Sequence, residues 1–304
     1  MAELLDGVEA PKTGEISYQK VIEILERKNI SRNTLLYLKE LLNTRSILDK
    51  SGYSGTSTII VPKRGQLSGY CIKFSENSLE EEKILLNLFN RYGLTSRVID
   101  YIRDSEDILI TESIDYPLAL ESISDYIELA KFMGKTLRNF HDIKWEKELT
   151  QEEQKVLENH GKRIITNSLE HSEGLEYMAA YQEDYDYNRM LEYIRENKED
   201  YQLDVIIHGD FNPRNVFAYK GNFMGFIDVT DAGYGDRHYD IFWTMWTIAL
   251  YSGILANKEK VQECERNFLE SYGYDMINEK RLTLSKKLNC MYWQPNNNIK
   301  YFNE

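Results

Sequence analysis

Hydrophobic residues near the start of the chain recur at helical spacing. Residues 16–28 place four aliphatic side chains on one stripe: Val21, Ile22, Ile24 and Leu25. Ser31 is a residue type that caps helices, and the leucines between 35 and 42 follow it with the same kind of spacing. The pattern predicts two amphipathic helices in a preface of about 45 residues, without indicating what they cover.

The pattern then changes to short β-like runs separated by small-residue turns. The turn at 51–57 precedes the run Thr58–Val61, and Arg64–Gln66 separates that run from Tyr70–Phe74, which predicts a hairpin. Three further elements are expected before residue 113: a helix over 78–89 and strands over 97–102 and 107–111.

Beyond Ser113 helical patterns dominate. The exceptions are Val205–Ile207 and a hairpin that turns at Lys220–Asn222 and leads into 224–228. A strand-rich segment followed by a helix-rich one predicts an α+β protein, with a first lobe over 1–113 and a second over 114–304.

Composition supports a folded protein of this size. The 304 residues are 42% hydrophobic and 12% aromatic, enough for a large core and unlike a disordered chain. The three cysteines are far apart and lack CxxC spacing, which favours reduced thiols over a disulfide or zinc framework. No apolar run reaches the roughly 18 residues of a membrane span, and the first residues lack a signal-peptide pattern. We expect a soluble, cytoplasmic protein that binds no membrane.

The net charge restricts the partners. At −13 it argues against a nucleic-acid ligand, because proteins that bind nucleic acids present basic faces. An acidic surface would attract a cationic ligand from a distance, although solubility alone also explains the charge.

The segment 208–215, His-Gly-Asp-Phe-Asn-Pro-Arg-Asn, carries the clearest chemistry. Asp210 and Asn215 lie on a loop between two apolar β runs, and Asp228 ends the strand that follows. Singly, each is explained as a turn residue. Together they offer what phosphoryl transfer requires: one carboxylate to accept an alcohol proton, and hard oxygen ligands for Mg²⁺.

These residues carry a family resemblance. His-Gly-Asp with Asn five residues after the Asp, then Ile-Asp, Gly-Asp and Tyr-Asp-Ile, resembles the aminoglycoside phosphotransferase family closely over 208–241. The resemblance implies a two-lobed, protein-kinase-like fold with a small β-rich N-lobe that binds nucleotide and a larger, mostly helical C-lobe for catalysis and substrate. It implies that Asp210 is the catalytic base and that Asn215 and Asp228 bind Mg²⁺. Asp240 matches a structural position.

The resemblance also assigns a phosphate-binding lysine in the first lobe. Lys73 lies on a predicted strand, where a fixed positive charge suits phosphate oxygens. Such a lysine needs an acidic partner from the next helix, where Glu80, Glu81 and Glu82 are candidates. Matching Glu82 and the residues after it to the family's helix favours Glu82.

The same resemblance implies further nucleotide contacts. The small-residue turn resembles a nucleotide-positioning loop, in which Gly52 would allow close approach and Ser54 would meet the β-phosphate. Adenine would pair with the carbonyl of Thr111 and the N–H of Ser113, with Ile110 at the back of the pocket. An ordinary buried strand explains the apolar residues there equally well.

An acidic, aromatic run at 181–187 precedes the catalytic strand. The resemblance places a substrate loop here, so Glu183, Asp184 and Asp186 are candidate ligands for ammonium groups. A solvated loop in an acidic protein is the alternative. Trp243 and Trp246, three residues apart after the Tyr-Asp-Ile motif, are interpreted as core residues.

The expected function is transfer of a phosphoryl group from ATP or GTP to a hydroxyl of an aminoglycoside-like cation, a resistance activity. A choline, sugar or amino-alcohol kinase on the same fold is the main alternative. A nucleotide-binding pseudoenzyme would not need Asp210. A protein kinase would carry Arg where Gly209 stands.

Overall fold

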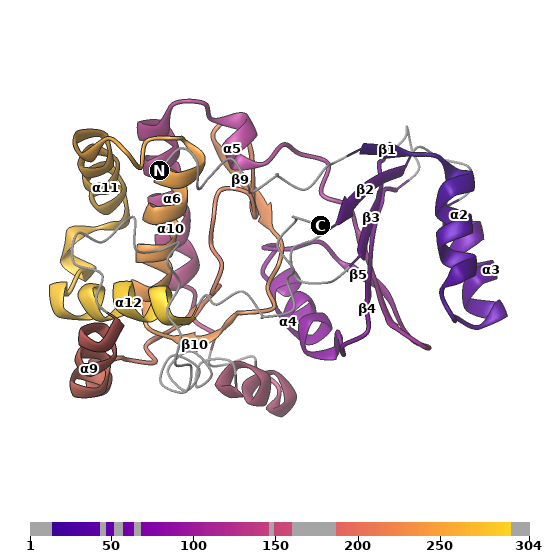
Figure 1. Cartoon of the computed structure of the whole chain (residues 1–304), viewed down its shortest axis with the longest axis horizontal. Coiled ribbons are helices and arrows are strands. Elements are labelled where there is room, and N and C mark those ends of the chain that lie inside the picture. Colours follow the sequence, from indigo (N-terminus) through magenta and orange to yellow (C-terminus); the bar gives the residue numbers. More distant parts are fainter. Residues whose placement is uncertain are drawn as a thin grey trace. The chain divides into compact units, whose positions relative to one another are not determined.

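The computed structural model describes residues 14–42, 47–51, 57–63, 68–145, 149–159 and 187–292. The chain divides into two compact units, 1–115 and 116–304, and each is described by itself. The first unit is built on a sheet and the second is mostly helical, so the predicted α+β class is confirmed (Figure 1).

The first unit contains a six-stranded antiparallel sheet in the order β1-β2-β3-β4-β6-β5. The predicted hairpin is confirmed, because β3 pairs with β4 along their lengths. The strands are β1 (Gly14–Ile16), β2 (Ile47–Ser51), β3 (Ser57–Val61), β4 (Tyr70–Ser75), β5 (Val98–Arg103) and β6 (Asp107–Glu112).

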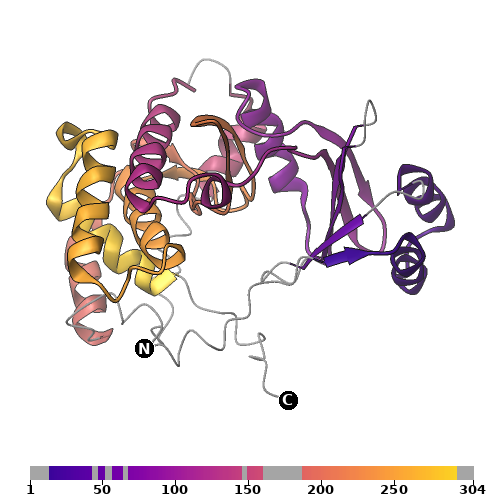
Figure 2. The ribbon, with the colours of Figure 1, turned by 90° about the horizontal axis from the view of Figure 1, so that it is seen from above.

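Helices cover both faces of this sheet. The two predicted preface helices, α2 (Tyr18–Arg27) and α3 (Arg32–Leu42), lie on one face, and α4 (Glu80–Arg91) lies on the other (Figures 1 and 2). Apolar side chains of α2 and α3 form one buried cluster with every second side chain of β3, β4 and β6: Val21, Leu25, Leu38, Leu42, Ile59, Val61, Ile72, Phe74, Ile108 and Ile110. The preface therefore buries a sheet face that would otherwise expose apolar surface to water.

Polar contacts fix the preface to the β5–β6 turn. Asp104 accepts hydrogen bonds from the backbone N–H of Ser31 at 2.9 Å and from the Thr34 hydroxyl at 2.6 Å. Lys28, at the end of α2, forms an ion pair with Glu106 at 2.6 Å. These contacts join the start of α3 and the end of α2 to one turn of the sheet.

The second unit combines helices with two small sheets, β7 paired with β10 and β8 paired with β9. The predicted hairpin is confirmed: Lys220 and Gly221 both have positive φ, 51° and 74°, as a two-residue type I′ turn requires. The strands are β7 (Val205–Ile207), β8 (Val216–Tyr219), β9 (Asn222–Phe226) and β10 (Gly233–Gly235). Its helices with described bounds include α5 (Ala119–Ser122), α6 (Tyr126–His141), α9 (Tyr187–Asn197), α10 (Arg237–Tyr251), α11 (Lys258–Tyr272) and α12 (Glu279–Tyr292), with 3₁₀ turns η1 (Lys198–Asp200) and η2 (Tyr274–Met276).

The centre of the second unit is α10. It contacts α6, α11 and α12, and every side chain from His238 to Ala249 is buried. A helix that is buried on all sides lies inside a protein, and the polar side chains that α10 buries, such as Asp240 and Thr244, are hydrogen-bonded. None of the helices within the described ranges is both long and apolar enough to cross a membrane.

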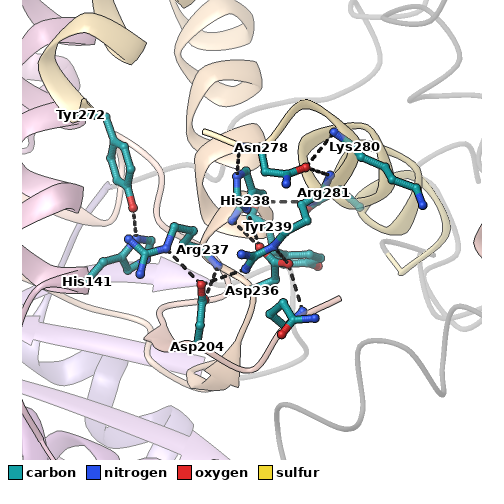
Figure 3. A network of polar contacts seen from close by, with 12 residues as sticks. His141, Asp204, Asp236, Arg237, His238, Tyr239, Tyr272, Asn278, Lys280 and Arg281 are labelled. Atoms are coloured by element: carbon teal, nitrogen blue, oxygen red, sulfur yellow. Dashed lines mark hydrogen bonds and ion pairs between the residues drawn. The ribbon is translucent and has the colours of Figure 1, made fainter. Parts of the chain in front are cut away.

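A buried carboxylate, Asp236, begins α10 and joins it to α12 (Figure 3). It accepts hydrogen bonds from the backbone N–H and Nδ1 of His238, from Arg281 Nε at 2.7 Å, and from the N–H of Gln202 at 3.1 Å. Burial alone would raise the pKa of Asp236, but the hydrogen bonds from His238 and Arg281 outweigh burial and hold the pKa below its ordinary value.

Asp236→Asn tests this junction. Asn caps helices about as well as Asp, so the variant removes the charge and keeps the cap. We expect the free energy of unfolding of the second unit to fall by about 3–5 kcal/mol, the usual loss when one partner of a buried ion pair is removed. Because the folded-state pKa is depressed, this difference is present above the ordinary aspartate pKa of about 3.9 and disappears as the pH falls through the folded-state pKa.

The matched control is Asp125→Asn at the exposed N-cap of α6, whose carboxylate accepts the N–H groups of Ile127 and Glu128. That change should alter the free energy of unfolding by no more than about 0.5 kcal/mol. Denaturant unfolding of both variants measures the effect. Equal stability of the two variants at neutral pH would show that the Asp236 charge contributes nothing.

Candidate active site

The loop His208–Asn215 joins β7 to β8, and its backbone is held from α10. The buried carboxylate of Asp240 accepts the N–H groups of His208 at 2.7 Å and Gly209 at 2.9 Å. Gly209 has φ +83°, and a Cβ at this position would collide with the backbone carbonyl of Asp231. Glycine is therefore dictated here by backbone geometry.

His208 supports the loop as a neutral ring. Its Nδ1 accepts the N–H of Asp210 at 3.3 Å, so Nε2 carries the proton and donates to the Ile227 carbonyl at 3.1 Å. Burial lowers the pKa of His208, consistent with the neutral form. The ring thus connects the Asp210 backbone to the end of β9.

The Asp210 side chain is held by three donors. Its Oδ1 accepts Asn212 Nδ2 at 2.7 Å and Trp243 Nε1 at 2.6 Å, and its Oδ2 accepts Asn215 Nδ2 at 2.7 Å. Burial, reinforced by the negative charge of Asp228, raises the pKa of Asp210 to about 7. A carboxylate with a pKa near neutrality is suited to accept a proton from an alcohol.

Asn215 and Asp228 lie beside this carboxylate. The Ile227 N–H donates to the Asn215 carbonyl at 2.9 Å, which fixes the start of Asp228 next to Asn215. Because Asn215 Nδ2 donates to Asp210, its Oδ1 is the side-chain atom left for a metal. Asp228 is exposed and has φ +60°, a conformation that non-glycine residues adopt rarely and that concentrates at functional sites.

These two oxygen donors fit Mg²⁺. Magnesium is usually bound by one or two carboxylates together with substrate phosphates. A carboxylate and an amide oxygen held next to a candidate base match that description. A cation bound to Asp228 would also lower the pKa of Asp210, because the negative charge of Asp228 contributes to raising that pKa.

In the first unit, Lys73 and Glu82 form an ion pair. Lys73 Nζ lies 2.8 Å from Glu82 Oε2 and 3.0 Å from Oε1. Ile72 and Phe74 belong to the cluster under α2 and α3, so Lys73, one residue from each, faces α4. Of the other candidate partners, Glu80 instead pairs with Arg103 and Lys83.

The same alternation changes the expected adenine contacts. Ile110 is fully buried in the cluster under α2 and α3, on the face opposite Lys73, whereas Leu109 is paired with Lys73 across the sheet. Side chains on a strand alternate between faces. Leu109, not Ile110, therefore lies on the face of the sheet where the adenine pocket is expected.

The two backbone groups expected to bind adenine lie on the β4 side of β6. The Ser113 N–H donates to the Gly69 carbonyl at 3.1 Å, and Thr111 is paired with Cys71. Adenine would have to replace the Ser113 bond, so these two contacts stay predictions. Gly52, Ser54, Glu183, Asp184 and Asp186 lie outside the described residues.

Two residues at Asp210 were not singled out by sequence for this role. Asn212 lies within the motif, two residues after Asp210, and its spacing is typical of a local side-chain bond. Trp243 was interpreted as a core residue, and it is buried, yet its indole N–H reaches Asp210. A buried Trp normally needs a partner for this N–H, which is a signal that sequence gives without naming the partner.

Comparison with known proteins decides the family. A protein-family sequence model described as the phosphotransferase enzyme family matches residues 61–263 of the 304-residue chain. The chain belongs to the phosphotransferase enzyme family. The protein is thus an enzyme that transfers a phosphoryl group to a hydroxyl, and the predicted resemblance is confirmed.

Relatives of this family member differ in substrate. A probable aminoglycoside 3′-phosphotransferase of Lactococcus lactis subsp. lactis (strain IL1403) is 27% identical over 257 residues, covering 81% of this chain and 90% of the relative. The solved type VIII aminoglycoside-3′-phosphotransferase is 21% identical with a TM-score of 0.57, covering 80% of this chain and 91% of the other. A Plasmodium vivax ethanolamine kinase is 18% identical with a TM-score of 0.59, covering 91% and 86%. At these identities the solved structures establish the two-lobed kinase-like fold.

Lys73→Ala tests the role of the ion pair. We expect KM for the nucleotide to rise about 10–100-fold, because a lost hydrogen bond to a charged group costs about 1.5–3 kcal/mol. KM for the acceptor should stay nearly unchanged in steady-state assays. The control is Lys28→Ala, which removes the partner of Glu106 on the opposite sheet face, where the pair is similarly half-buried. Equal nucleotide KM values in both variants would exclude a specific role for Lys73.

Proposed function

We propose that this enzyme transfers the γ-phosphoryl group of ATP or GTP to a hydroxyl of an aminoglycoside-like cationic small molecule, with Asp210 as the base. The observation that carries the proposal is the arrangement at Asp210. Its carboxylate is oriented by three hydrogen bonds, and it has a pKa raised to about 7. If the acceptor is an antibiotic, its phosphorylation is a resistance function.

The chemistry assigned to the chain is a single displacement. The acceptor oxygen forms a bond to the γ-phosphorus while the bond to the bridging β–γ oxygen breaks, and the acceptor proton passes to Asp210. Asn215 and Asn212 orient the base through their amide N–H groups. The nucleoside diphosphate leaves with the bridging oxygen.

Asn215 Oδ1 and Asp228 are the residues we assign to Mg²⁺. Magnesium bound with the nucleotide would neutralise charge on the phosphate oxygens. In the first unit, Lys73 is assigned to the nucleotide phosphates and Glu82 to fixing the Lys73 ammonium group. The solved spectinomycin phosphotransferase is a complex with ADP and spectinomycin, which supports a nucleotide donor for this fold.

The acceptor is proposed from charge and kinship. The net charge of −13 would draw a polycation toward the enzyme. The Lactococcus relative, which is similar over 90% of its own length, is described as a probable aminoglycoside 3′-phosphotransferase. Glu183, Asp184 and Asp186 remain the proposed contacts for its ammonium groups. Choline and ethanolamine kinases share the fold, so an amino alcohol is the alternative acceptor.

A nucleotide-consumption screen of the purified enzyme tests the acceptor. The panel is streptomycin, spectinomycin, choline, ethanolamine and glucose, each with ATP or GTP and Mg²⁺. We expect turnover with an aminoglycoside, and its KM should rise with salt because screening shortens the range of attraction to about 8 Å at 0.15 M. Turnover with choline or ethanolamine alone would replace the aminoglycoside proposal by an amino-alcohol kinase.

Asp210→Asn is the control that assigns the activity to this site. The loss of a general base typically lowers turnover by about 10²–10⁴-fold, while nucleotide affinity should survive, since Asp210 is assigned to the acceptor. Nucleotide affinity measured by calorimetry separates the two effects. Unchanged turnover in this variant would remove Asp210 from the role of base.

A further inference from the structure

Trp243 reaches the candidate base from another element of the second unit. It lies on α10, 33 residues from Asp210 in sequence, and its Nε1 is 2.6 Å from Asp210 Oδ1. Asn212 and Asn215 belong to the same loop as Asp210 and move with it. Trp243 ties the carboxylate to the buried core instead.

One face of α10 holds the whole neighbourhood of Asp210. Asp240 accepts the N–H groups of His208 and Gly209 just before it, and the Thr244 hydroxyl donates to the Phe211 carbonyl just after it, at 2.6 Å. Residues 240, 243 and 244 have the i, i+3, i+4 spacing of neighbours on a helix face. Two of them fix the backbone on either side of Asp210, and Trp243 fixes its side chain.

The three donors are distributed unequally over the two carboxylate oxygens of Asp210. A carboxylate oxygen accepts about two hydrogen bonds, and Oδ1 already accepts Trp243 and Asn212. Among the described residues Oδ2 accepts Asn215, which leaves room on that oxygen for one more donor. The open position therefore lies on the oxygen that also contacts the candidate metal ligand Asn215.

We propose that Trp243 is a positioning residue for Asp210, whose indole N–H saturates Oδ1 so that the acceptor hydroxyl is received by Oδ2. This inference rests on the proposed function, because it requires Asp210 to be the base. Trp243 itself touches neither acceptor nor nucleotide in this proposal. It acts by holding the carboxylate in one rotamer.

The ring of Trp243 is held rigidly enough for this role. It is only 5% exposed and packs against Trp246 with ring centroids 5.2 Å apart. A core role and a positioning role make different demands on the side chain. Packing needs the indole shape, whereas positioning needs the N–H.

The decisive variant separates shape from hydrogen bonding. Replacing Trp243 with 3-benzothienylalanine exchanges the N–H for sulfur and keeps the ring shape. We expect kcat for the best acceptor of the panel to fall about 10–100-fold, the effect of slight misplacement of a reacting group. KM for nucleotide should not change, and the melting temperature should fall by no more than a few degrees, because one hydrogen bond to a buried carboxylate is lost while the packing is kept. The same replacement at Trp246, equally buried in the same cluster, should leave kcat unchanged.

A kcat equal to that of the wild type in the benzothienyl variant at 243 would overturn the proposal. Trp243→Phe is the simpler variant and should show the same loss of kcat with some loss of stability, since it also leaves space in the core. In an Asp210→Asn background, either change at 243 should have little further effect, because Trp243 acts through Asp210. Full turnover in Asp210→Asn alone would mean that the proposed function has failed, independently of Trp243.

A spectroscopic readout needs no acceptor. In protein labelled with ¹⁵N at tryptophan, the indole N–H signal of Trp243, assigned by its disappearance in Trp243→Phe, should lie downfield because of its charged acceptor. Asp210→Ala should move it strongly upfield while moving the Trp246 signal little. An unmoved Trp243 signal would show that the hydrogen bond is not formed in solution, and would refute the proposal.

Discussion

The backbone N–H groups of His208 and Gly209, at the start of the loop that carries Asp210, both donate to one buried carboxylate, Asp240. A buried N–H that loses its partner costs about 1–3 kcal/mol. The loop 208–215 and α10 are therefore expected to fold as one unit. His141, from α6, contacts the same carboxylate at 3.2 Å. The other hydrogen bonds of Asp210 within the second unit depend on this junction, because it sets where Asp210 lies relative to α10.

The first unit depends on a different constraint, the two-sidedness of its sheet. One face is apolar and is closed by the preface helices, and the other presents Lys73 toward Glu82 of α4. A strand can carry a charged residue between two core residues only because alternate side chains face opposite sides. The preface helices α2 and α3 have a physical role in this arrangement, because they bury the side of the sheet opposite Lys73.

Much of this could be predicted because it is local. Asp210 and Asn215 lie within six residues, so their spacing alone brings them together. Asn212 lies between them at the spacing of a local side-chain bond, a signal that was present but not used. The turn at Lys220 and the amphipathic helices are likewise determined by residues close together in the sequence. Lys73 and Glu82 lie on consecutive elements, a strand and the helix that follows it. Matching that helix to the family's helix was enough to select Glu82.

What could not be predicted depends on partners far away in the sequence. The face on which Ile110 lies follows from the register of β4 with β6, which no single strand reveals. The strand β10 is three residues with two glycines, a poor strand signal that is stabilised by pairing with β7. The bond of Trp243 to Asp210 and that of Arg281 to Asp236 span tens of residues, so sequence shows the buried polar group without its partner.

The most direct measurement is a crystal structure of the enzyme with Mg²⁺, a non-hydrolysable ATP analogue and the acceptor found in the screen. The acceptor hydroxyl should lie within hydrogen-bond distance of Asp210 Oδ2, with Asn215 Oδ1 and Asp228 bound to the metal and Lys73 on the phosphates. A metal bound by other residues, or a hydroxyl remote from Asp210, would contradict the assignment of this loop as the catalytic centre.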